Sequence, residues 1–420
     1  MNFSPSLSGV KSAAKVLKDI VKTTPFQYNQ RISNKLNCNV YLKREDLQLV
    51  RSFKIRGAYN KVNSVANKAR KTGVVCASAG NHAQGFALAC SSLKIHGIVY
   101  MPITTPKQKI EQVKTFGKKY VKVELIGDFF DDCQSIAIDF AKQQNKIFIH
   151  AFNDTKVIEG QGTAALEILN QIDKQLDYLF VPIGGGGLVS GVLTVFKELS
   201  PKTKIIGVEP SGAQAMTKSL ENGKVYTLKD IDKFVDGAAV KRVGELTLKC
   251  CKNLLDEIIH VHEGKICKTI LDLYNKDGIV SEPAGALGIA GLEVYGNEKI
   301  IKKNIGVFIC GGNNDFFRIS EIKERALLYA KLKHYFIIKF PQRSGALKDF
   351  LNKVLGPNDD ITFFEYSKKN SRTNAPAIIG IELKKQDDLK PLVDKMKKYN
   401  FFGEYINNKP DLFQIFLENT

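Results

Sequence analysis

Short apolar strands alternate with amphipathic helices through most of residues 40–330, and this alternation limits the fold more than any other feature. The expected strands lie at residues 39–42, 73–77, 98–101, 178–183, 205–208 and 306–309. Pro106 opens one of the helices between them, and Gly117 ends it. Strands this short, rich in β-branched residues and separated by helices, are typical of a parallel α/β sheet buried between helical layers.

The order of elements changes after about residue 330. There the sequence predicts strand, helix, strand, strand, helix and strand at residues 335–340, 345–355, 361–366, 377–383, 387–399 and 412–417. This order is typical of a small ferredoxin-like module. Residues 321–333 are expected to form a helical connector. We therefore predict two domains, at residues 1–325 and 334–420.

Bulk composition indicates an ordinary globular chain. The 420 residues are 44% hydrophobic and 25% charged. No apolar run approaches the roughly 18–20 residues that a membrane span needs, and the N-terminus lacks a secretion signal. The eight cysteines include no Cys-x-x-Cys pair, which favours a cytoplasmic location without structural zinc or disulfides. The net charge of +19 comes from dispersed lysines, so we expect a solvated lysine-rich surface and no nucleic-acid or membrane partner.

Lys54 lies between Phe53 and Ile55-Arg56-Gly57, and its amine can form a Schiff base with an aldehyde. An isolated lysine of this kind is usually a surface residue. Two glycine-bearing loops farther along the chain change that interpretation, because glycines that open a helix can hold the phosphate of an aldehyde-bearing molecule. Together these features indicate pyridoxal 5'-phosphate, an electron sink for reactions at the Cα of an amino acid.

The segment Gly184-Gly185-Gly186-Gly187 stands between a predicted strand and a predicted helix at residues 188–199. Four NH groups without Cβ atoms can wrap closely around a phosphate. The segment could be a flexible linker, but linkers rarely join a buried strand to a helix without polar neighbours. A dinucleotide-binding loop would need Gly-x-Gly-x-x-Gly, and position 189 is Val. We therefore favour phosphate binding.

The loop that begins Ser78-Ala79-Gly80 links a strand to a helix, whose first NH groups can attract a carboxylate. Asn81 can offer its amide to a ring hydroxyl or cap the helix, and the residues alone leave both readings open. His82 is expected to be a hydrogen-bonding residue rather than a base. Cys310 is expected to end a strand, where its thiol could face the cofactor's ring nitrogen or be a small buried hydrophobe.

Six segments, in this order, resemble the threonine dehydratases (threonine ammonia-lyases) of the fold-type II pyridoxal-phosphate enzymes. They are Tyr41–Leu47, Ser52–Lys54, Ser78–Gly85, Gly160–Thr163, Gly207–Pro210 and Glu282–Ala286. The resemblance extends over essentially the whole chain and implies an α/β catalytic domain with two lobes, each built on a parallel sheet. Related cysteine synthases and threonine synthases usually have an aspartate after the lysine, so Ile55 favours the dehydratase branch.

This resemblance implies roles for the residues singled out above. Lys54 is the implied catalytic residue, joined to the cofactor and then freed by the substrate amine to remove the Cα proton. The implied cofactor-binding residues are Phe53, Lys54, Asn81, Gly184, Gly185, Gly186, Gly187, Leu188, Glu282 and Cys310. The implied substrate-binding residues, around the carboxylate, are Ser78, Gly80, Asn81 and His82.

Two departures from relatives narrow the expected chemistry. Ala79 stands where serine racemases of this family have a second acid–base serine, so racemisation is disfavoured. Ala215 stands six residues after Glu209, where some relatives have an acidic metal ligand, so we expect no metal site built that way. The sequence leaves open whether a monovalent cation binds.

Residues 340–347 and 355–362 resemble the ACT-like regulatory domain of biosynthetic threonine dehydratases, in the short form with one such module. Ser344 departs from the family, where proline is common. The implied reaction is deamination of L-threonine to 2-oxobutanoate and ammonia, and L-serine is an alternative substrate. This is the first step of isoleucine biosynthesis, and the resemblance implies inhibition by isoleucine, opposition by valine, and a homo-tetramer or dimer. A catabolic serine/threonine dehydratase and a non-catalytic amino-acid sensor stay open as alternatives.

Overall fold

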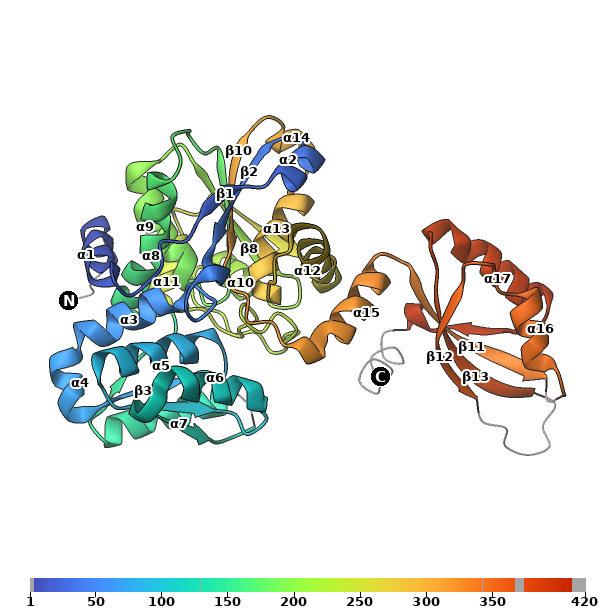
Figure 1. Cartoon of the computed structure of the whole chain (residues 1–420), viewed down its shortest axis with the longest axis horizontal. Helices are drawn as coiled ribbons and strands as arrows, with labels where there is room; N and C mark the ends of the chain where they lie inside the picture. The colour runs from blue at the N-terminus through green and yellow to red at the C-terminus, as the bar shows by residue number, and fades with distance from the viewer. Residues whose placement is uncertain (1–3, 129, 342, 367–373, 410–420) are drawn as a thin grey trace. The chain divides into compact units, whose positions relative to one another are not determined.

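The structure is a computed structural model that describes residues 4–128, 130–341, 343–366 and 374–409. The chain divides into two compact units, Met1–Phe316 and Phe317–Thr420 (Figure 1). No helix in the described ranges is long and apolar enough to cross a membrane.

A six-stranded sheet lies at the centre of the first unit, in the order β1-β2-β10-β7-β8-β9. All neighbouring strands are parallel except β1, which pairs with β2 in the antiparallel direction. Every residue of β7 is buried, as expected for a central strand covered on both faces. The strands are β1 (Phe26–Tyr28), β2 (Asn39–Arg44), β7 (Tyr178–Pro182), β8 (Lys204–Pro210), β9 (Glu257–Val261) and β10 (Asn304–Ile309).

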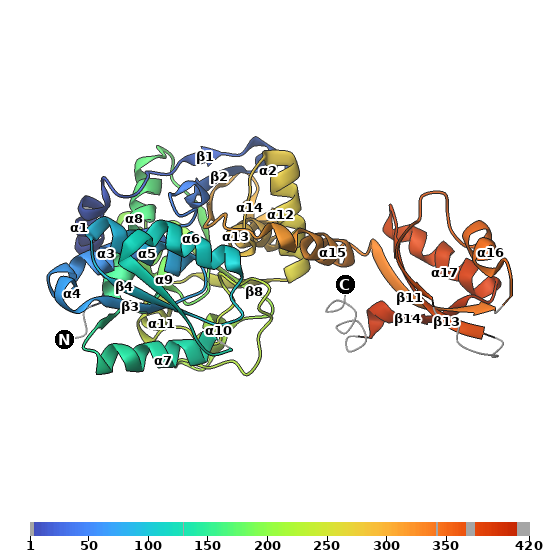
Figure 2. The same ribbon diagram turned by 60° about the horizontal axis from the view of Figure 1, so that its bottom comes forward.

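A separate four-stranded parallel sheet, in the order β5-β4-β3-β6, forms the second lobe of this unit. Its strands are β3 (Val74–Ala77), β4 (Gly97–Met101), β5 (Val121–Leu125) and β6 (Ile147–Phe148). Alternate residues of β3 face opposite cores: Cys76 belongs to the core with Phe86 of α5, and Val75 to the core with Ala137 of α7. These two helices lie on opposite faces of the sheet (Figure 2). The expected two-lobed parallel-sheet fold is therefore confirmed.

Helices connect and cover both sheets. Their bounds are α1 (Leu7–Leu17), α2 (Gln30–Leu36), α3 (Lys54–Ser64), α4 (Ala66–Thr72), α5 (Asn81–Leu93), α6 (Lys107–Gly117), α7 (Phe130–Gln143), α8 (Thr155–Asn170), α9 (Gly187–Leu199), α10 (Ala215–Glu221), α11 (Glu245–Cys251), α12 (Glu263–Asp277), α13 (Pro283–Tyr295) and α14 (Asn297–Ile300). Pro283 starts α13, whose residues are buried as far as Leu292 because the helix packs against β7 and β10. The predicted helix at Pro106 is confirmed as α6, which ends at Gly117.

The second unit begins with α15 (Ile319–Tyr329) and continues with a four-stranded antiparallel sheet. The order along the chain is β11 (Lys333–Pro341), α16 (Ala346–Lys353), β12 (Asp360–Tyr366), β13 (Asn374–Glu382), α17 (Leu389–Lys398) and β14 (Phe402–Tyr405). The sheet order β12-β13-β11-β14 is that of a ferredoxin-like module. The predicted last strand at residues 412–417 lies outside the described residues, and the sixth element is β14.

Aromatic side chains fill the core of the second unit. Phe340 of β11 contacts the rings of Phe350 on α16 and Phe401, with centroids 5.7 and 5.6 Å away. Phe336 and Met396 are fully buried in the same cluster. This unit therefore has an apolar core of its own, between the sheet and its two helices.

Candidate active site

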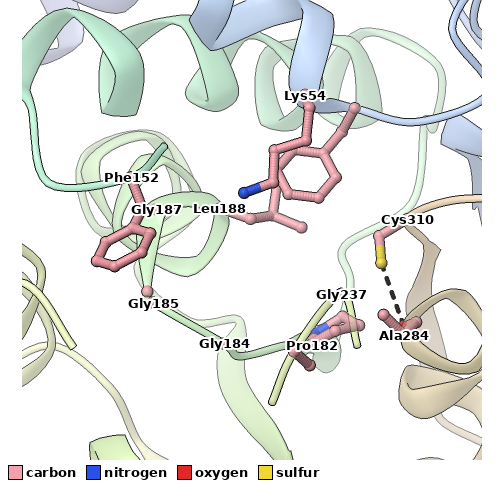
Figure 3. Close-up of a pocket in the computed structure, with 13 residues that line it drawn as sticks. Lys54, Phe152, Pro182, Gly184, Gly185, Gly187, Leu188, Gly237, Ala284 and Cys310 are labelled. Atoms are coloured by element: carbon pink, nitrogen blue, oxygen red, sulfur yellow. Dashed lines mark hydrogen bonds between the residues drawn. The ribbon is translucent and has the colours of Figure 1, made fainter. Parts of the chain in front are cut away.

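A pocket in the first unit brings Lys54 together with the glycine quartet, Gly184–Gly187, although the two are far apart in the sequence (Figure 3). The pocket lies where α3, α9 and α13 begin and where β10 ends. Of the predicted cofactor-binding residues, only Asn81 and Glu282 are absent from its lining. The lining residues are Phe53, Lys54, Phe152, Pro182, Gly184, Gly185, Gly186, Gly187, Leu188, Gly237, Ala238, Ala284 and Cys310.

Lys54 is the first residue of α3, and its amine points into the pocket (Figure 3). Nζ donates to the carbonyl oxygen of Ala151 at 3.3 Å and lies 5.3 Å from the ring centroid of Phe53. Burial lowers the pKa of the Lys54 amine to about 8, although the nearby Cys310 and Glu282 act in the opposite direction. A larger fraction of the amine is therefore in its neutral, nucleophilic form near pH 7.

The glycine quartet is the turn that leads into α9, and no side chain caps this helix. Gly186 has φ +92°, a conformation that favours glycine. A Cβ at Gly185 would lie 2.3 Å from the ring of Phe152, so the quartet also needs glycine to fit its neighbours. The uncapped N-terminus of α9 at the pocket can receive an anion on its first NH groups.

Thr247 of α11 stabilises the glycine quartet through a hydrogen bond. Its buried hydroxyl donates to the carbonyl oxygen of Gly185 at 2.7 Å and accepts from the backbone NH of Gly244 at 3.0 Å. The sequence analysis missed Thr247, together with the lining residues Phe152, Pro182, Gly237, Ala238 and Ala284. Phe152 carries a weak signal, since it follows β6 and ligands bind at the carboxyl ends of parallel strands, but β6 has only two residues and was itself not predicted. Thr247 carries no comparable local signal.

Asn81 and Glu282 lie in direct contact. Nδ2 of Asn81 donates to Oε1 of Glu282 at 2.6 Å, and Nδ2 of Asn313 donates to Oδ1 of Asn81 at 2.7 Å. The reading of Asn81 as a helix cap was wrong, because Asn81 is the first residue of α5 and Gly80 occupies the cap position. Burial raises the pKa of the Glu282 carboxyl to about 7, and the hydrogen bond from Asn81 partly offsets that effect.

The loop predicted to bind the substrate carboxylate forms the start of α5. Oγ of Ser78 accepts from the backbone NH of Gly80 at 3.2 Å, and the space in front of Gly80 is open, since a Cβ there would meet nothing within 4 Å. His82 lies 3.1 Å from the carbonyl oxygen of Ile149 through Nε2, and its Nδ1 has no hydrogen-bond partner among the described residues. Burial, with a smaller contribution from Lys54, lowers the pKa of His82 to about 3, so its ring is neutral.

Cys310 follows β10 and is both buried and part of the pocket lining. Its thiol donates to the carbonyl oxygen of Ala284 at 3.2 Å (Figure 3). Burial raises the pKa of this thiol well above its usual value, so it stays protonated. Cys310 can therefore be both a small buried residue and a group that faces the cofactor's ring nitrogen, the two interpretations that the sequence left open.

Glu209, six residues before Ala215, binds the first turn of α10. Its carboxylate accepts from the NH groups of Met216 and Thr217 at 2.7 and 3.0 Å, and from the Thr217 hydroxyl at 2.6 Å. Within the described ranges, no group of three or more His, Cys, Asp or Glu side chains could hold a metal ion.

The pocket residues fit pyridoxal phosphate. The Lys54 amine suits its aldehyde, the uncapped start of α9 suits its phosphate, and Phe53 and Ala238 can cover the ring. Fold and pocket together define the class: the chain belongs to the pyridoxal-phosphate dependent enzymes, whose family model matches residues 17–311.

The comparisons with known proteins narrow the class further. A model for the C-terminal regulatory domain of threonine dehydratase matches residues 324–416. A biosynthetic L-threonine dehydratase of Halalkalibacterium halodurans is 54% identical over 405 residues, which are 96% of this chain and 97% of that protein. One of Bacillus subtilis is 52% identical over 401 residues, covering 96% and 95%. The processed form of threonine deaminase isoform 2 from Solanum lycopersicum is 39% identical, with TM-score 0.72 over 77% of this chain and 95% of that one. The chain is a member of the biosynthetic threonine dehydratase family, in the form with a single regulatory domain.

Proposed function

We propose that this chain deaminates L-threonine to 2-oxobutanoate and ammonia. The observation that carries the proposal is the meeting of the Lys54 amine and the uncapped, glycine-lined start of α9 in one pocket. When bound, pyridoxal phosphate supplies an electron sink for the electron pair that remains at Cα once its proton has left.

The chain's own residues then have distinct tasks. Lys54 would hold the aldehyde of the bound cofactor, and its neutral amine, once free, would take the Cα proton of the substrate. The start of α5, from Ser78 to His82, binds the substrate carboxylate, and the glycine quartet binds the cofactor phosphate. The β-hydroxyl leaves as water, and hydrolysis of the released enamine gives 2-oxobutanoate and ammonia.

Cys310 and Glu282 adjust the electronics of the site. The protonated thiol of Cys310 would present a neutral group to the ring nitrogen of a bound cofactor, which would limit charge delocalisation and favour prompt elimination over transamination. Glu282 and Asn81 form a hydrogen-bonded pair, and Asn81 would contact the ring hydroxyl of a bound cofactor.

Residues 1–325 carry the catalysis in this proposal, and residues 334–420 regulate it. The match to the threonine dehydratase regulatory domain supports inhibition by isoleucine and opposition by valine. A homo-tetramer or dimer would place the regulatory modules where they can couple subunits. The eight cysteines all lie within the described residues and none of them forms a disulfide, which supports a cytoplasmic location.

Formation of 2-oxobutanoate from L-threonine, with and without isoleucine, tests the function. We expect turnover that isoleucine suppresses and that is absent in Lys54→Ala. Turnover unaffected by isoleucine, with L-serine preferred, would instead favour a catabolic dehydratase. Binding of isoleucine without any turnover would favour a sensor.

A further inference from the structure

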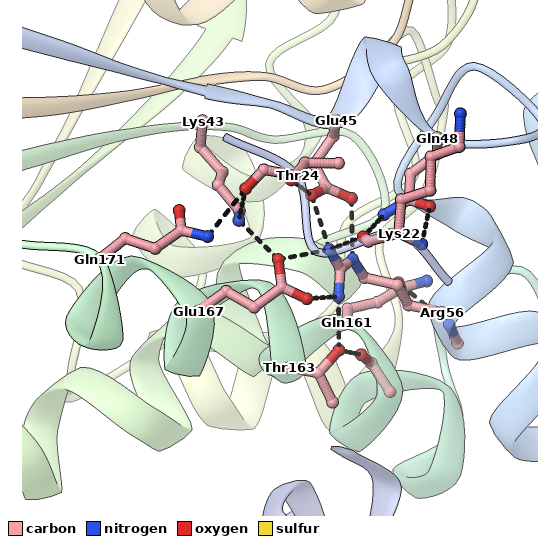
Figure 4. Close-up of polar contacts among 12 residues, drawn as sticks. Lys22, Thr24, Lys43, Glu45, Gln48, Arg56, Gln161, Thr163, Glu167 and Gln171 are labelled. Atoms are coloured by element: carbon pink, nitrogen blue, oxygen red, sulfur yellow. Dashed lines mark hydrogen bonds and ion pairs between the residues drawn. The ribbon is translucent and has the colours of Figure 1, made fainter. Parts of the chain in front are cut away.

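Arg56 is fully buried and lies at the centre of an ion-pair network (Figure 4). Its Nε and Nη2 donate to the two carboxylate oxygens of Glu45, both at 2.8 Å. Its Nη1 and Nη2 donate to the two oxygens of Glu167 at 2.6 and 2.8 Å. The guanidinium therefore holds two carboxylates, each through a pair of hydrogen bonds.

Lys43 completes the network and balances its charge. Its Nζ donates to Glu167 at 2.5 Å and to the carbonyl oxygen of Thr24 at 2.7 Å. The network thus contains two cations, Arg56 and Lys43, and two carboxylates. Although burial opposes ionisation of Glu45, the nearby guanidinium lowers the pKa of that carboxyl, so both members of the pair stay charged.

The network is attached to the helical turn that carries Lys54. Arg56 follows Lys54 by two positions in the first turn of α3, so at about 100° per residue the two side chains leave the helix on opposite sides. No side chain caps this helix and no acidic residue lies in its first turn. Two cations at a helix N-terminus are unfavourable, and the carboxylates of Glu45 and Glu167 supply the compensating charge from neighbouring elements.

Helix α8 holds the same turn at close range. The Oε1 of Gln161 accepts from the backbone NH of Gly57 at 3.1 Å, and Thr163 accepts from Nη1 of Arg56 at 3.1 Å. A Cβ at Gly160 would lie 2.5 Å from the carbonyl oxygen of Arg56, so the two helices are in backbone contact there. The start of α3 is thus held by Glu45, in the turn after β2, and by residues of α8.

We propose that Arg56 is a positioning residue, which fixes the first turn of α3 so that the Lys54 amine enters the pocket in one direction. The proposal rests on the proposed function, because it concerns the amine that holds the cofactor. It also gives a reason for two sequence segments without a chemical role, Tyr41–Leu47 and Gly160–Thr163, since both supply partners of Arg56.

Two variants test the proposal against a matched control. Arg56→Lys keeps the charge but loses the planar guanidinium, whose NH groups reach both carboxylates. Glu167→Gln keeps the side-chain volume and one acceptor at a partly exposed position, and it decides the question if Arg56→Lys does not fold. The control is Arg31→Lys, which changes the ion pair with Asp277 elsewhere in the same unit, away from the pocket.

The measurements are the rate at which cofactor-free protein captures pyridoxal phosphate, the visible absorption maximum of the loaded protein, and kcat and KM for L-threonine. For Arg56→Lys we expect capture and kcat to fall about 10- to 100-fold with a shifted absorption maximum, because the amine is misplaced. KM should change by less than about threefold, because the substrate loop is untouched. Glu167→Gln should show smaller changes in the same direction, and Arg31→Lys should show none.

The opposite pattern would show that the network only stabilises the fold. In that case Arg56→Lys and Glu167→Gln would lower the midpoint of thermal unfolding yet match Arg31→Lys in capture rate, absorption maximum and kcat. A wild-type protein that captures no pyridoxal phosphate would overturn the proposed function, and the positioning role with it.

Discussion

Lys54 carries the only amine among the described residues that line the pocket. Its neighbours in the sequence, Phe53 and Ile55, indicate a lysine that can hold the cofactor. They do not predict the protonation state of its amine. That state comes from burial between segments distant in the chain, which lowers the pKa of the amine to about 8. The chemistry of this residue is therefore set by its tertiary surroundings.

Capture of pyridoxal phosphate by the cofactor-free protein should depend on pH through Lys54. Only the neutral amine attacks an aldehyde, so the rate constant should rise about tenfold per pH unit below the pKa and level off above it. With a pKa of about 8, the midpoint should lie near pH 8. Stopped-flow absorbance measures it. A midpoint near the ordinary lysine value of 10.5 would show that the amine is solvated.

Cys310→Asp should change the outcome of the reaction. A carboxylate facing the ring nitrogen would hold a proton there and strengthen charge delocalisation, which favours transamination over elimination. We expect the ratio of pyridoxamine phosphate to 2-oxobutanoate to increase about tenfold, and product analysis measures it. Cys310→Ser keeps a neutral partner and should behave like wild type. An unchanged ratio in Cys310→Asp would exclude a contact with the ring nitrogen.

Thr247→Val should weaken cofactor binding without removing any residue of the pocket lining. Valine has a similar size, but it lacks the hydroxyl that bonds Gly185 and Gly244. Losing these buried hydrogen bonds costs about 1–3 kcal/mol, so the equilibrium dissociation constant should rise about tenfold. Thr269→Val is the matched control, because that buried hydroxyl bonds only within α12, to Lys265. Equal affinity in the two variants would contradict a role for Thr247 in supporting the quartet.

The crossing of α3 over α8 depends on glycine. A Cβ at Gly160 would lie 2.7 Å from Cα of Gly57, in addition to its contact with Arg56. Gly160→Ala should therefore lower the free energy of unfolding by about 1–3 kcal/mol. Chemical denaturation measures this. Gly80→Ala, which meets nothing within 4 Å, should change stability by less than about 1 kcal/mol. If Gly160→Ala left the free energy of unfolding unchanged, α3 and α8 could move apart at no cost, and their crossing would not depend on glycine.

Helices and strands with a strong local pattern could be predicted from the sequence. Elements with a weak pattern, and the pairing of strands, could not be predicted in that way. The central strands of the large sheet are apolar throughout and were predicted within a few residues. The strands β1 and β6 were missed because they have only three and two residues, and β5 and β9 were missed because they are mostly half-buried and lack a distinct pattern. The division of the strands between two sheets was expected from the family resemblance, since local patterns do not reveal which strands pair.

The residues of the candidate site also divide into those that a local pattern predicts and those that only tertiary contacts reveal. Gly184–Gly187 and Cys310 follow strands, and Lys54 begins a helix. The residue types at these positions carry a chemical signal, so they could be predicted from the sequence. The contacts of Asn81 with Glu282, of Thr247 with Gly185 and of Arg56 with Glu167 join segments that only the fold brings together. No pattern within one segment predicts such pairs.

The molecule contains two compact units with separate cores. Phe336 is fully buried in the second unit, where its ring lies 5.1 Å from that of Tyr405. Phe336→Ala should destabilise this unit by about 3–5 kcal/mol and remove isoleucine inhibition while turnover of L-threonine persists. Calorimetry and 2-oxobutanoate assays measure both effects. Phe180→Ala, in the core of the first unit, should instead reduce turnover. Equal loss of turnover in both variants would contradict a division of labour between the units.

Borohydride reduction of the cofactor-loaded protein, followed by tryptic mapping, tests most directly whether the amine at position 54 holds the cofactor. Reduction converts the linkage into a stable secondary amine, and trypsin does not cut after a modified lysine. We expect the pyridoxyl group on the peptide Ser52–Arg56, with Lys54 uncut, and on no other peptide from a chain with 62 lysines and arginines. A pyridoxyl group on a different lysine, or none on this peptide, would contradict the assignment of Lys54.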